Sequence, residues 1–311
     1  FILLSGGLLG LFAAANIWIF LVFILLVFCL LRVDQWSIWI RRTTAIFLVL
    51  GGVLMMYGSF VESQKLVVRN FDLSLEGLSS MRLVVMADLH VGPYKKRDWI
   101  ERVVETINTI PEVDMVLVPG DFVYGSSTVF GQELTPLSRL AYPLYATLGN
   151  HDHDLDATIN GPQEEGVRKA LTDAGIIELN NASVDLDLVQ IVGLDDNEFG
   201  FHDVDKAFES VDPEKGTVLL VHSPDILDEI QDRKVDLVIT GHTHCGQIRI
   251  PGYGALPMTI PTRNGKKYER HLYQFPNRSL FITCGVGEVG PRARLFNPPE
   301  VVVLHINQKN K

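Results

Sequence analysis

The sequence predicts an α/β fold in which helices flank a two-layer core of β-sheet, preceded by transmembrane helices. Three observations predict this architecture. Strand-like and helix-like stretches alternate over residues 71–308, the strand-like stretches are short runs of apolar and β-branched residues, and long uncharged runs occupy the N-terminus. With 311 residues, of which 47% are hydrophobic, the chain is long enough for one large domain and an additional segment.

The additional segment consists of two uncharged runs, residues 1–31 and 43–61. A helix needs about 20 mostly apolar residues to cross a membrane, and both runs are long enough. Asn16 could divide the first run into two helices. A signal peptide is the alternative for this run, although signal peptides usually have a basic start and a shorter apolar stretch. The chain begins with Phe1 rather than Met, which leaves open a segment upstream.

The charges between the two runs predict an orientation. This loop contains Arg32, Arg41 and Arg42 against the single acid Asp34. An excess of Lys and Arg in a short loop favours the cytoplasmic side, so the residues after Val61 would lie on the outer face of the membrane. The arginine pair is also weakly similar to a twin-arginine export signal.

The remaining elements follow from apolar runs and helical spacing. The expected strands are Arg82–Ala87, Asp114–Val118, Val189–Gly193, Thr217–Val221, Leu237–Thr240, Phe281–Cys284 and Val301–His305. The expected helices are Arg97–Ile110, in which apolar residues recur at helical spacing, and Pro162–Ala174. We expect residues 62–70 to be a short connector and 249–275 to be a long loop.

Seven polar residues in five clusters come directly after strand-like runs. They are Asp88, His90, Asp121, Asn150, His222, His242 and His244. Open α/β sheets build their sites at such strand ends, so we expect these side chains on one rim of the core. Asp88 and His90 are two residues apart, a spacing that places both side chains on one face of an extended segment.

This combination of side chains predicts a site for two divalent metal ions. A carboxylate such as Asp121 can bridge two cations, and Asn150 offers a neutral oxygen. Mixed oxygen and nitrogen ligands suit manganese, our first expectation, and also zinc, iron, cobalt or magnesium. Two such ions about 3.5–4 Å apart can share a hydroxide nucleophile and hold a phosphoryl group.

The clusters also carry a resemblance. Asp88-x-His90, Gly120-Asp121, Gly149-Asn150-His151-Asp152, His222 and Gly241-His242-x-His244 together resemble the calcineurin-like metallophosphoesterase superfamily over residues 82–245. Gly285-Val-Gly and the segment from Arg294 to Glu300 are similar to its membrane-associated bacterial branch, which includes YkuE and YaeI. That branch is similar to the UDP-2,3-diacylglucosamine pyrophosphatase of lipid A synthesis.

The resemblance implies a four-layer αββα sandwich and a dinuclear site. It implies that one metal is held by Asp88, His90 and His244, the other by Asn150, His222 and His242, and that Asp121 bridges them. His151 would face the leaving group as a general acid, and Asp152 would orient its loop. Many relatives have an Asp, and some a following Arg, where this chain has Tyr124 and Gly125. These two positions therefore provide neither a carboxylate partner for His151 nor a phosphate-binding arginine.

We therefore expect residues 1–64 to form the transmembrane segment and 65–311 to form a catalytic domain on the outer face of a bacterial inner membrane. This domain would cleave a phosphoester or pyrophosphate with metal-activated hydroxide. A membrane anchor favours a lipid-linked, phosphorylated substrate such as UDP-2,3-diacylglucosamine. Cations within 249–275 could contact a phosphate, an anionic membrane surface or only solvent. The alternative function is a non-catalytic sensor or scaffold that binds a phospholigand.

Two further features bound the function. The net charge of −10 argues against a nucleic-acid partner, which normally requires a basic surface, and the oligomeric state is left open. Cys29, Cys245 and Cys284 lack CxxC spacing, which predicts buried thiols rather than a disulfide or a structural zinc site. We expect His202, His271 and His305 to pack structurally, whereas His153 is near the site only in sequence.

Overall fold

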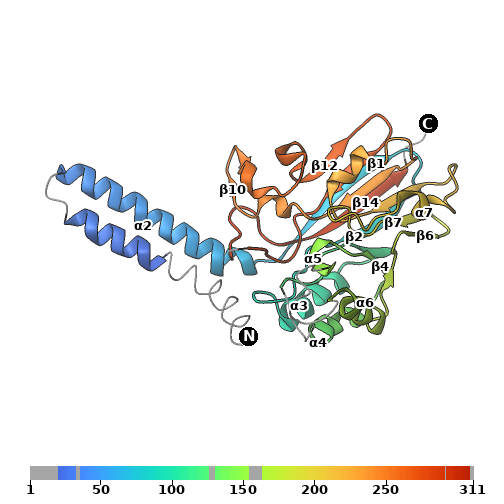
Figure 1. Cartoon of the computed structure of the whole chain (residues 1–311), viewed down its shortest axis with the longest axis horizontal. Coiled ribbons are helices and arrows are strands. Elements are labelled where there is room, and N and C mark those ends of the chain that lie inside the picture. The colour runs from blue at the N-terminus through green and yellow to red at the C-terminus, as the bar shows by residue number, and fades with distance from the viewer. Residues whose placement is uncertain (1–19, 33–35, 126–129, 154–162, 291, 309–311) are drawn as a thin grey trace.

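The computed structural model of the chain describes residues 20–32, 36–125, 130–153, 163–290 and 292–308. Residues 67–308 contain an α/β sandwich with two six-stranded sheets between layers of helices (Figure 1). In spatial order, the first sheet contains β1 (Val67–Leu75), β14 (Glu300–Gln308), β2 (Met81–Val85), β3 (Met115–Pro119), β4 (Leu144–Thr147) and β5 (Ile177–Glu178). The second contains β12 (His271–Gln274), β13 (Ser279–Ile282), β9 (Leu237–Thr240), β8 (Thr217–Leu220), β7 (Gln190–Gly193) and β6 (Ala182–Asp185).

Both faces of each sheet are buried, because successive side chains of a strand point to opposite faces and each face packs against another layer. In β2, Leu83 and Val85 point into the core between the sheets, whereas Val84 points to the helices outside. The second sheet supplies Leu220 and Phe281 to the same central core. Strands buried on two faces appear in sequence as continuous apolar runs, which is why most of them could be located by inspection.

Helices cover the outer face of each sheet. The first sheet is covered by α3 (Arg97–Asn108), α4 (Phe130–Leu134) and α6 (Gln163–Asp173). The second is covered by α7 (Val204–Phe208) and the short 3-10 helix η3 (Pro224–Asp228). The two predicted helices, over 97–110 and 162–174, are therefore confirmed as α3 and α6, with ends that differ by one or two residues.

Two segments differ from the sequence-based expectation. Residues 62–70 are not only a connector, because β1 begins at Val67 and pairs in parallel with β14 from the other end of the chain. The segment 249–275 is not one loop, since it contains β10 (Arg249–Ile250), β11 (Gly254–Ala255) and all of β12. In both cases the pairing partner, rather than a long apolar run, makes the strand.

The N-terminal part forms two apolar helices that lie side by side (Figure 1). The described part of the first helix runs over Phe20–Leu31, and α2 runs over Ile38–Phe60. With the turn that follows it, α2 is long and apolar enough to cross a membrane. Large apolar side chains on it are exposed, including Trp39 at 71% and Phe47 at 74%. The predicted break at Asn16 and the acid Asp34 lie outside the described residues.

The core between the sheets generates a stability prediction. Replacing fully buried Leu83 with Ala should lower the free energy of unfolding by about 2–5 kcal/mol, because apolar contacts are lost and a cavity remains. The matched control, Leu188→Ala, removes the same side chain from an exposed position and should change it by less than about 0.5 kcal/mol. Denaturant titration of both variants in detergent tests this, and equal effects would contradict the described core.

Candidate active site

The predicted site residues all lie just beyond the carboxyl ends of parallel strands. Asp88 follows β2, Asp121 follows β3, and Asn150 begins the short helix α5 (Asn150–His153) after β4. From the second sheet, His222 follows β8, and His242 and His244 follow β9. Because β2, β3, β4, β8 and β9 run parallel within their sheets, these residues reach the same end of the sandwich.

The side chains of these residues converge on a small volume. Ligand atoms of Asp88, His90 and His244 lie within 4.8 Å of one another, and so do those of Asp88, Asp121 and His222. The Nε2 atoms of His90 and His244 are 3.0 Å apart. The Oδ2 atom of Asp121 is 3.4 Å from Nε2 of His90 and 3.0 Å from Nε2 of His222. Asp121 is thus the carboxylate that faces imidazoles from both sheets.

His242 and Asn150 complete the cluster. The ring of His242 lies 4.9 Å from that of His222, centroid to centroid. Next to Asn150, the backbone N–H of His151 donates a 3.0 Å hydrogen bond to Oδ1 of Asp121. The structure therefore gathers all seven residues that the sequence singled out at one edge.

Backbone carbonyls orient three of the histidine rings. Nδ1 of His222 donates to the Pro119 carbonyl over 2.7 Å, and Nε2 of His242 donates to the Pro261 carbonyl over 2.7 Å. Nδ1 of His90 lies 3.3 Å from the Val123 carbonyl. A carbonyl can only accept, so each of these nitrogens carries a proton. In His90 and His242, whose pKa values are lowered by burial, the other ring nitrogen therefore has a free lone pair.

Several buried polar atoms at the site have no hydrogen-bond partner. Among the described residues they include Oδ2 of Asp88 and Oδ1 of Asn150. Buried polar groups are almost always paired, so two orphaned acceptors in one cluster call for a bound group. Carboxylate and amide oxygens with imidazole nitrogens are the ligands that divalent transition metals take. The residues present therefore fit metal ions.

The electrostatics agree with that chemistry. Burial raises the pKa of Asp88 to about 7 and lowers the pKa of His90 to about 3 and that of His242 to about 4. These imidazoles are therefore neutral at neutral pH and can act as ligands. Burial would also lower the pKa of His222, but the adjacent carboxylate of Asp121 outweighs it and raises the pKa to about 10. Asp121 and His222 thus hold a proton that a bound cation would displace.

The backbone at the site is strained. Asp88, His90, Asp121, His242 and His244 all have positive φ, between 45° and 65°. Non-glycine residues rarely adopt this region, and such strain concentrates at functional sites. Gly285, at φ 72°, permits the close fit around Asp88, because a Cβ there would lie 2.5 Å from Oδ2 of Asp88.

His151 lies at the edge of the cluster and is half-buried. Its ring centroid is 5.1 Å from that of His90 and 5.2 Å from that of Tyr124. Tyr124 occupies the position where many relatives have an acid, and its hydroxyl accepts a hydrogen bond from the Gly290 N–H. No carboxylate hydrogen-bonds the His151 ring among the residues that the structure describes.

Asp152 fixes the loops that carry two of the site residues. Its fully buried carboxylate accepts hydrogen bonds from the N–H groups of Phe122, Val123 and Gly149. It thereby joins the loop after β3 to the loop after β4. Burial raises the pKa of Asp152 to about 7.

Sequence reasoning did not assign roles to Arg294 and Asn297. Arg294 is fully buried, donates to the carbonyls of Cys284 and Gly287, and places Nη2 3.4 Å from Nδ1 of His244. Asn297 donates to the carbonyl of His244 over 2.8 Å. In the sequence, the segment Arg294–Glu300 stood out only through its resemblance to the membrane-associated branch. The feature that could have pointed to a role is the single basic residue, Arg294, at the start of this apolar and Pro-rich segment.

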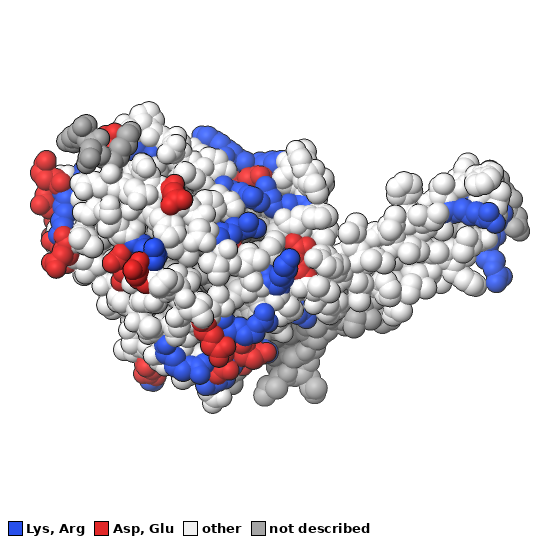
Figure 2. Space-filling model, turned by 180° about the vertical axis from the view of Figure 1, so that it is seen from behind, with Lys and Arg blue, Asp and Glu red and all other residues white. Residues whose placement is uncertain are grey.

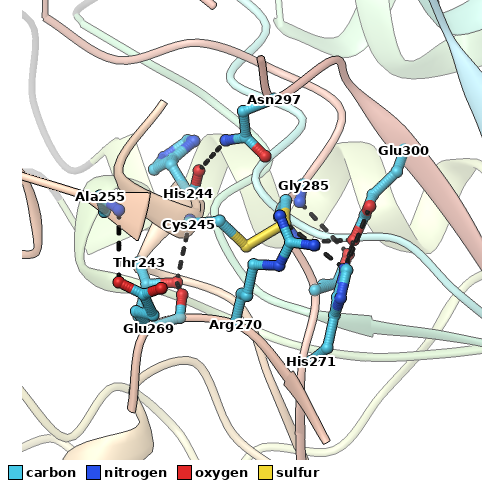
Figure 3. Close-up of a disulfide and its surroundings, with 12 residues drawn as sticks. Thr243, His244, Cys245, Ala255, Glu269, Arg270, His271, Gly285, Asn297 and Glu300 are labelled. Carbon is cyan, nitrogen blue, oxygen red and sulfur yellow. Dashed lines mark hydrogen bonds and ion pairs between the residues drawn. A yellow bond between two sulfur atoms is a disulfide. The ribbon is translucent and has the colours of Figure 1, made fainter. Parts of the chain in front are cut away.

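The prediction for the cysteines was wrong. Cys245 and Cys284 form a disulfide, next to His244, His271 and Glu300 (Figure 3), and Cys29 is an exposed free cysteine. Because β13 and β9 are parallel neighbours, the residues after both strands emerge together. A separation of 39 residues gives no hint of this pairing. His271 and Glu300 are hydrogen-bonded to each other, and Glu300 also accepts from the Cys284 N–H, so this group is structural.

Comparison with known proteins gives the family. The profile described as calcineurin-like phosphoesterase matches residues 81–246, which contain every one of the seven clustered residues. The chain belongs to the calcineurin-like phosphoesterase family. The expectation from the motifs is thereby confirmed, and the chain is a metal-dependent phosphohydrolase of a family that uses divalent metals.

Three relatives illustrate the range of this family. The "Uncharacterized metallophosphoesterase YkuE" of Bacillus subtilis is 29% identical over 75% of this chain and 82% of its own length. "UDP-2,3-diacylglucosamine pyrophosphatase LpxG" of Chlamydia muridarum is 28% identical over 73% of this chain and 84% of its own. A "Transmembrane protein with metallophosphoesterase domain" of Danio rerio is 26% identical over 96% of this chain and 73% of its own.

One further histidine near the phosphoesterase site generates a pH prediction. Both ring nitrogens of His153 are engaged, with Asp195 at 2.6 Å and Glu164 at 3.0 Å, so the ring is a structural bridge. Burial alone would lower the pKa of His153, but the two carboxylates outweigh it and raise the pKa. The stability that these ion pairs contribute is therefore present at acidic pH and lost as the pH rises through the raised pKa.

We expect the melting temperature of the chain to fall more steeply, as the pH rises above the ordinary histidine pKa of about 6.5, than that of His153→Gln, which lacks the titrating ring. The matched control is His305→Gln, which changes a histidine remote from the site. Parallel curves for the wild type and His153→Gln would contradict the proposed bridge.

Proposed function

We propose that the chain is a membrane-anchored phosphohydrolase with two divalent metal ions, manganese as the first expectation. Asp88, His90 and His244 would hold one ion, Asn150, His222 and His242 the other, and Asp121 would bridge them. The observation that carries this proposal is the convergence of buried imidazole nitrogens with carboxylate and amide oxygens at the strand ends, where Oδ2 of Asp88 and Oδ1 of Asn150 have no hydrogen-bond partner.

Each part of the site has a role in cleaving a phosphoester or pyrophosphate bond. When bound, the metal ions supply Lewis-acid chemistry that activates water and neutralises phosphoryl charge. The carbonyls of Pro119 and Pro261 keep His222 and His242 in the tautomers that face the cluster. His151, at its edge, donates a proton to the leaving-group oxygen as the bond breaks. Asp152 holds the loop that carries His151.

The substrate class follows from the anchor. We assign residues 1–64 to the membrane segment and 65–311 to the catalytic domain. The exposed apolar surface of α2 favours a lipid environment, and an anchor raises the local concentration of lipid-borne substrates. The name of the LpxG relative states a lipid-linked pyrophosphate substrate. Both observations support a phosphoester or pyrophosphate attached to a lipid.

The disulfide supports an outward orientation. Disulfides persist in oxidising compartments outside the cytoplasm, and Cys245–Cys284 lies in the catalytic domain. The arginines between the two apolar runs favour the same orientation. We therefore place the catalytic domain on the outer face of a bacterial inner membrane, where it would meet exported lipid phosphates rather than cytosolic UDP-linked precursors.

The metal content and the turnover of the purified full chain test the catalytic proposal. With added manganese, we expect about two ions per chain and hydrolysis of at least one of bis-p-nitrophenyl phosphate, p-nitrophenyl phosphate and UDP-2,3-diacylglucosamine. Asp121→Asn should abolish turnover and lower the metal content, because the bridging carboxylate is lost. His151→Gln should keep its metal while kcat falls about 10²–10⁴-fold.

The control for these variants is His305→Gln, which should retain both metal and turnover. Full activity of Asp121→Asn would refute the assigned bridge. Tight phosphate binding without turnover at saturating metal would instead favour the sensor or scaffold alternative.

A fluorescent reporter fused after Lys311 tests the orientation. A reporter that fluoresces only in the cytoplasm should remain dark, and thiol labelling of intact cells should modify Cys245 and Cys284 only after reduction. A bright reporter would overturn the outward placement without affecting the metal site.

A further inference from the structure

A group of exposed apolar side chains lies beside the end of α2. Ile248, Ile250, Tyr253 and Phe296 are 36%, 45%, 54% and 50% exposed. Ile250 and Tyr253 lie in the β10–β11 hairpin, and Ile248 directly precedes it. Phe296 follows Leu295, which forms an isolated β-bridge with Ile248. We call these four residues the hairpin patch. Figure 1 places β10 at the end of the domain from which α2 extends.

Hydrogen bonds fix the position of the hairpin patch along the axis of α2. The Arg294 N–H donates to the carbonyl of Gly58, in the last turn of α2, over 3.0 Å. One residue further on, the Leu295 carbonyl accepts from the Arg249 N–H over 2.9 Å. Two consecutive residues therefore connect the end of the helix to the base of the hairpin.

The length of α2 gives the depth of its last turn. At about 1.5 Å per residue, its 23 residues extend for about 35 Å, slightly more than the hydrocarbon core of a bilayer of about 30 Å. The ends of a spanning helix of this length lie at the level of the headgroups. The hairpin patch lies at the same level, because it is tied to Gly58.

The composition of the hairpin patch suits that level. Tyr and aliphatic side chains with nearby cations are typical of membrane interfaces. Nζ of Lys266 lies 3.6 Å from the ring centroid of Tyr253. Phe296 has a φ of 54°, a conformation that is costly for a bulky residue, yet its side chain is half exposed rather than packed in the core.

An open pocket of about 440 Å³ adjoins the hairpin patch, and the residues that line it include Ile250, Tyr253, Phe296, Arg249, Glu269 and Arg270. Arg249 is paired with Glu269 over 2.6 Å, and the guanidinium of Arg270 points toward Glu300 and the disulfide (Figure 3). Figure 2 shows a band of Lys and Arg side chains across the part of the domain nearer the helix. This charge distribution is complementary to anionic phospholipid headgroups.

We infer that the hairpin patch rests among the phospholipid headgroups of the membrane that α2 spans, with Lys266 facing lipid phosphate beside Tyr253. This inference depends on the proposed anchor. The β10–β11 hairpin follows His244 by five residues, so the contact would hold the metal-ligand loop close to the bilayer surface, where a lipid-borne phosphoester is presented.

Nitroxide accessibility of the full chain tests the inference in nanodiscs of phosphatidylglycerol and phosphatidylcholine. In a Cys29→Ser background that keeps the disulfide, Ile250→Cys, Tyr253→Cys and Phe296→Cys would each carry one spin label. We expect the ratio of oxygen to nickel-chelate accessibility at these positions to be several-fold higher than at the matched controls, Leu188→Cys and Phe199→Cys. Both control positions are similarly exposed, at 45% and 48%, and belong to the region of β6 and β7, far from α2.

A label at Phe47→Cys, on the exposed surface of α2, separates the possible failures. If this label is in lipid and the hairpin labels are fully accessible to the nickel chelate, the anchor stands and the inference is overturned. Hairpin labels that are inaccessible to both reagents, in a chain that light scattering shows to be dimeric, would also overturn it in favour of a contact between two copies. Neither readout requires turnover, so failure of the catalytic proposal is detected separately.

Discussion

The buried carboxylate of Asp88 is the contact on which the arrangement of the site depends, because loops from both sheets close around it. Oδ1 accepts a hydrogen bond from the His242 N–H over 3.0 Å, and Gly285 approaches from the loop after β13 in the second sheet. A fully buried carboxylate is costly unless it is compensated, which the rise of its pKa to about 7 expresses. Orphaned acceptors around it leave a cation as the natural compensation.

Rigid supports outside the ligand cluster hold this arrangement in place. Asp152 ties the loops after β3 and β4 through three backbone N–H groups, and the disulfide ties the loop after β9 to the end of β13. Positive φ angles at five of the clustered residues are tolerated because these supports overdetermine the backbone. The contacts of Asp152 and the disulfide thus offset the unfavourable free energy of backbone strain and of carboxylate burial. The donor atoms are therefore preorganised for the metal ions of a phosphoesterase.

One short segment connects α2 to the site. The backbone of Arg294 contacts Gly58 in the last turn of α2, while its guanidinium lies 3.4 Å from Nδ1 of His244. Asn297, three residues later, holds the carbonyl of His244, and its N–H donates to Glu62 just beyond α2. The helix α2 therefore ends directly against the residues that position His244, an arrangement that suits the proposed membrane-anchored hydrolase.

The sequence by itself determined the α/β class, the apolar N-terminal helices and the seven clustered residues, because buried strands are continuous apolar runs and each site residue follows one directly. Only the tertiary structure decided three other features: the pairing of β1 with β14, the Cys245–Cys284 disulfide, and the support of His244 by Arg294 and Asn297. Each of these joins segments far apart in the chain, and their proximity results from sheet order, which local residue patterns do not encode.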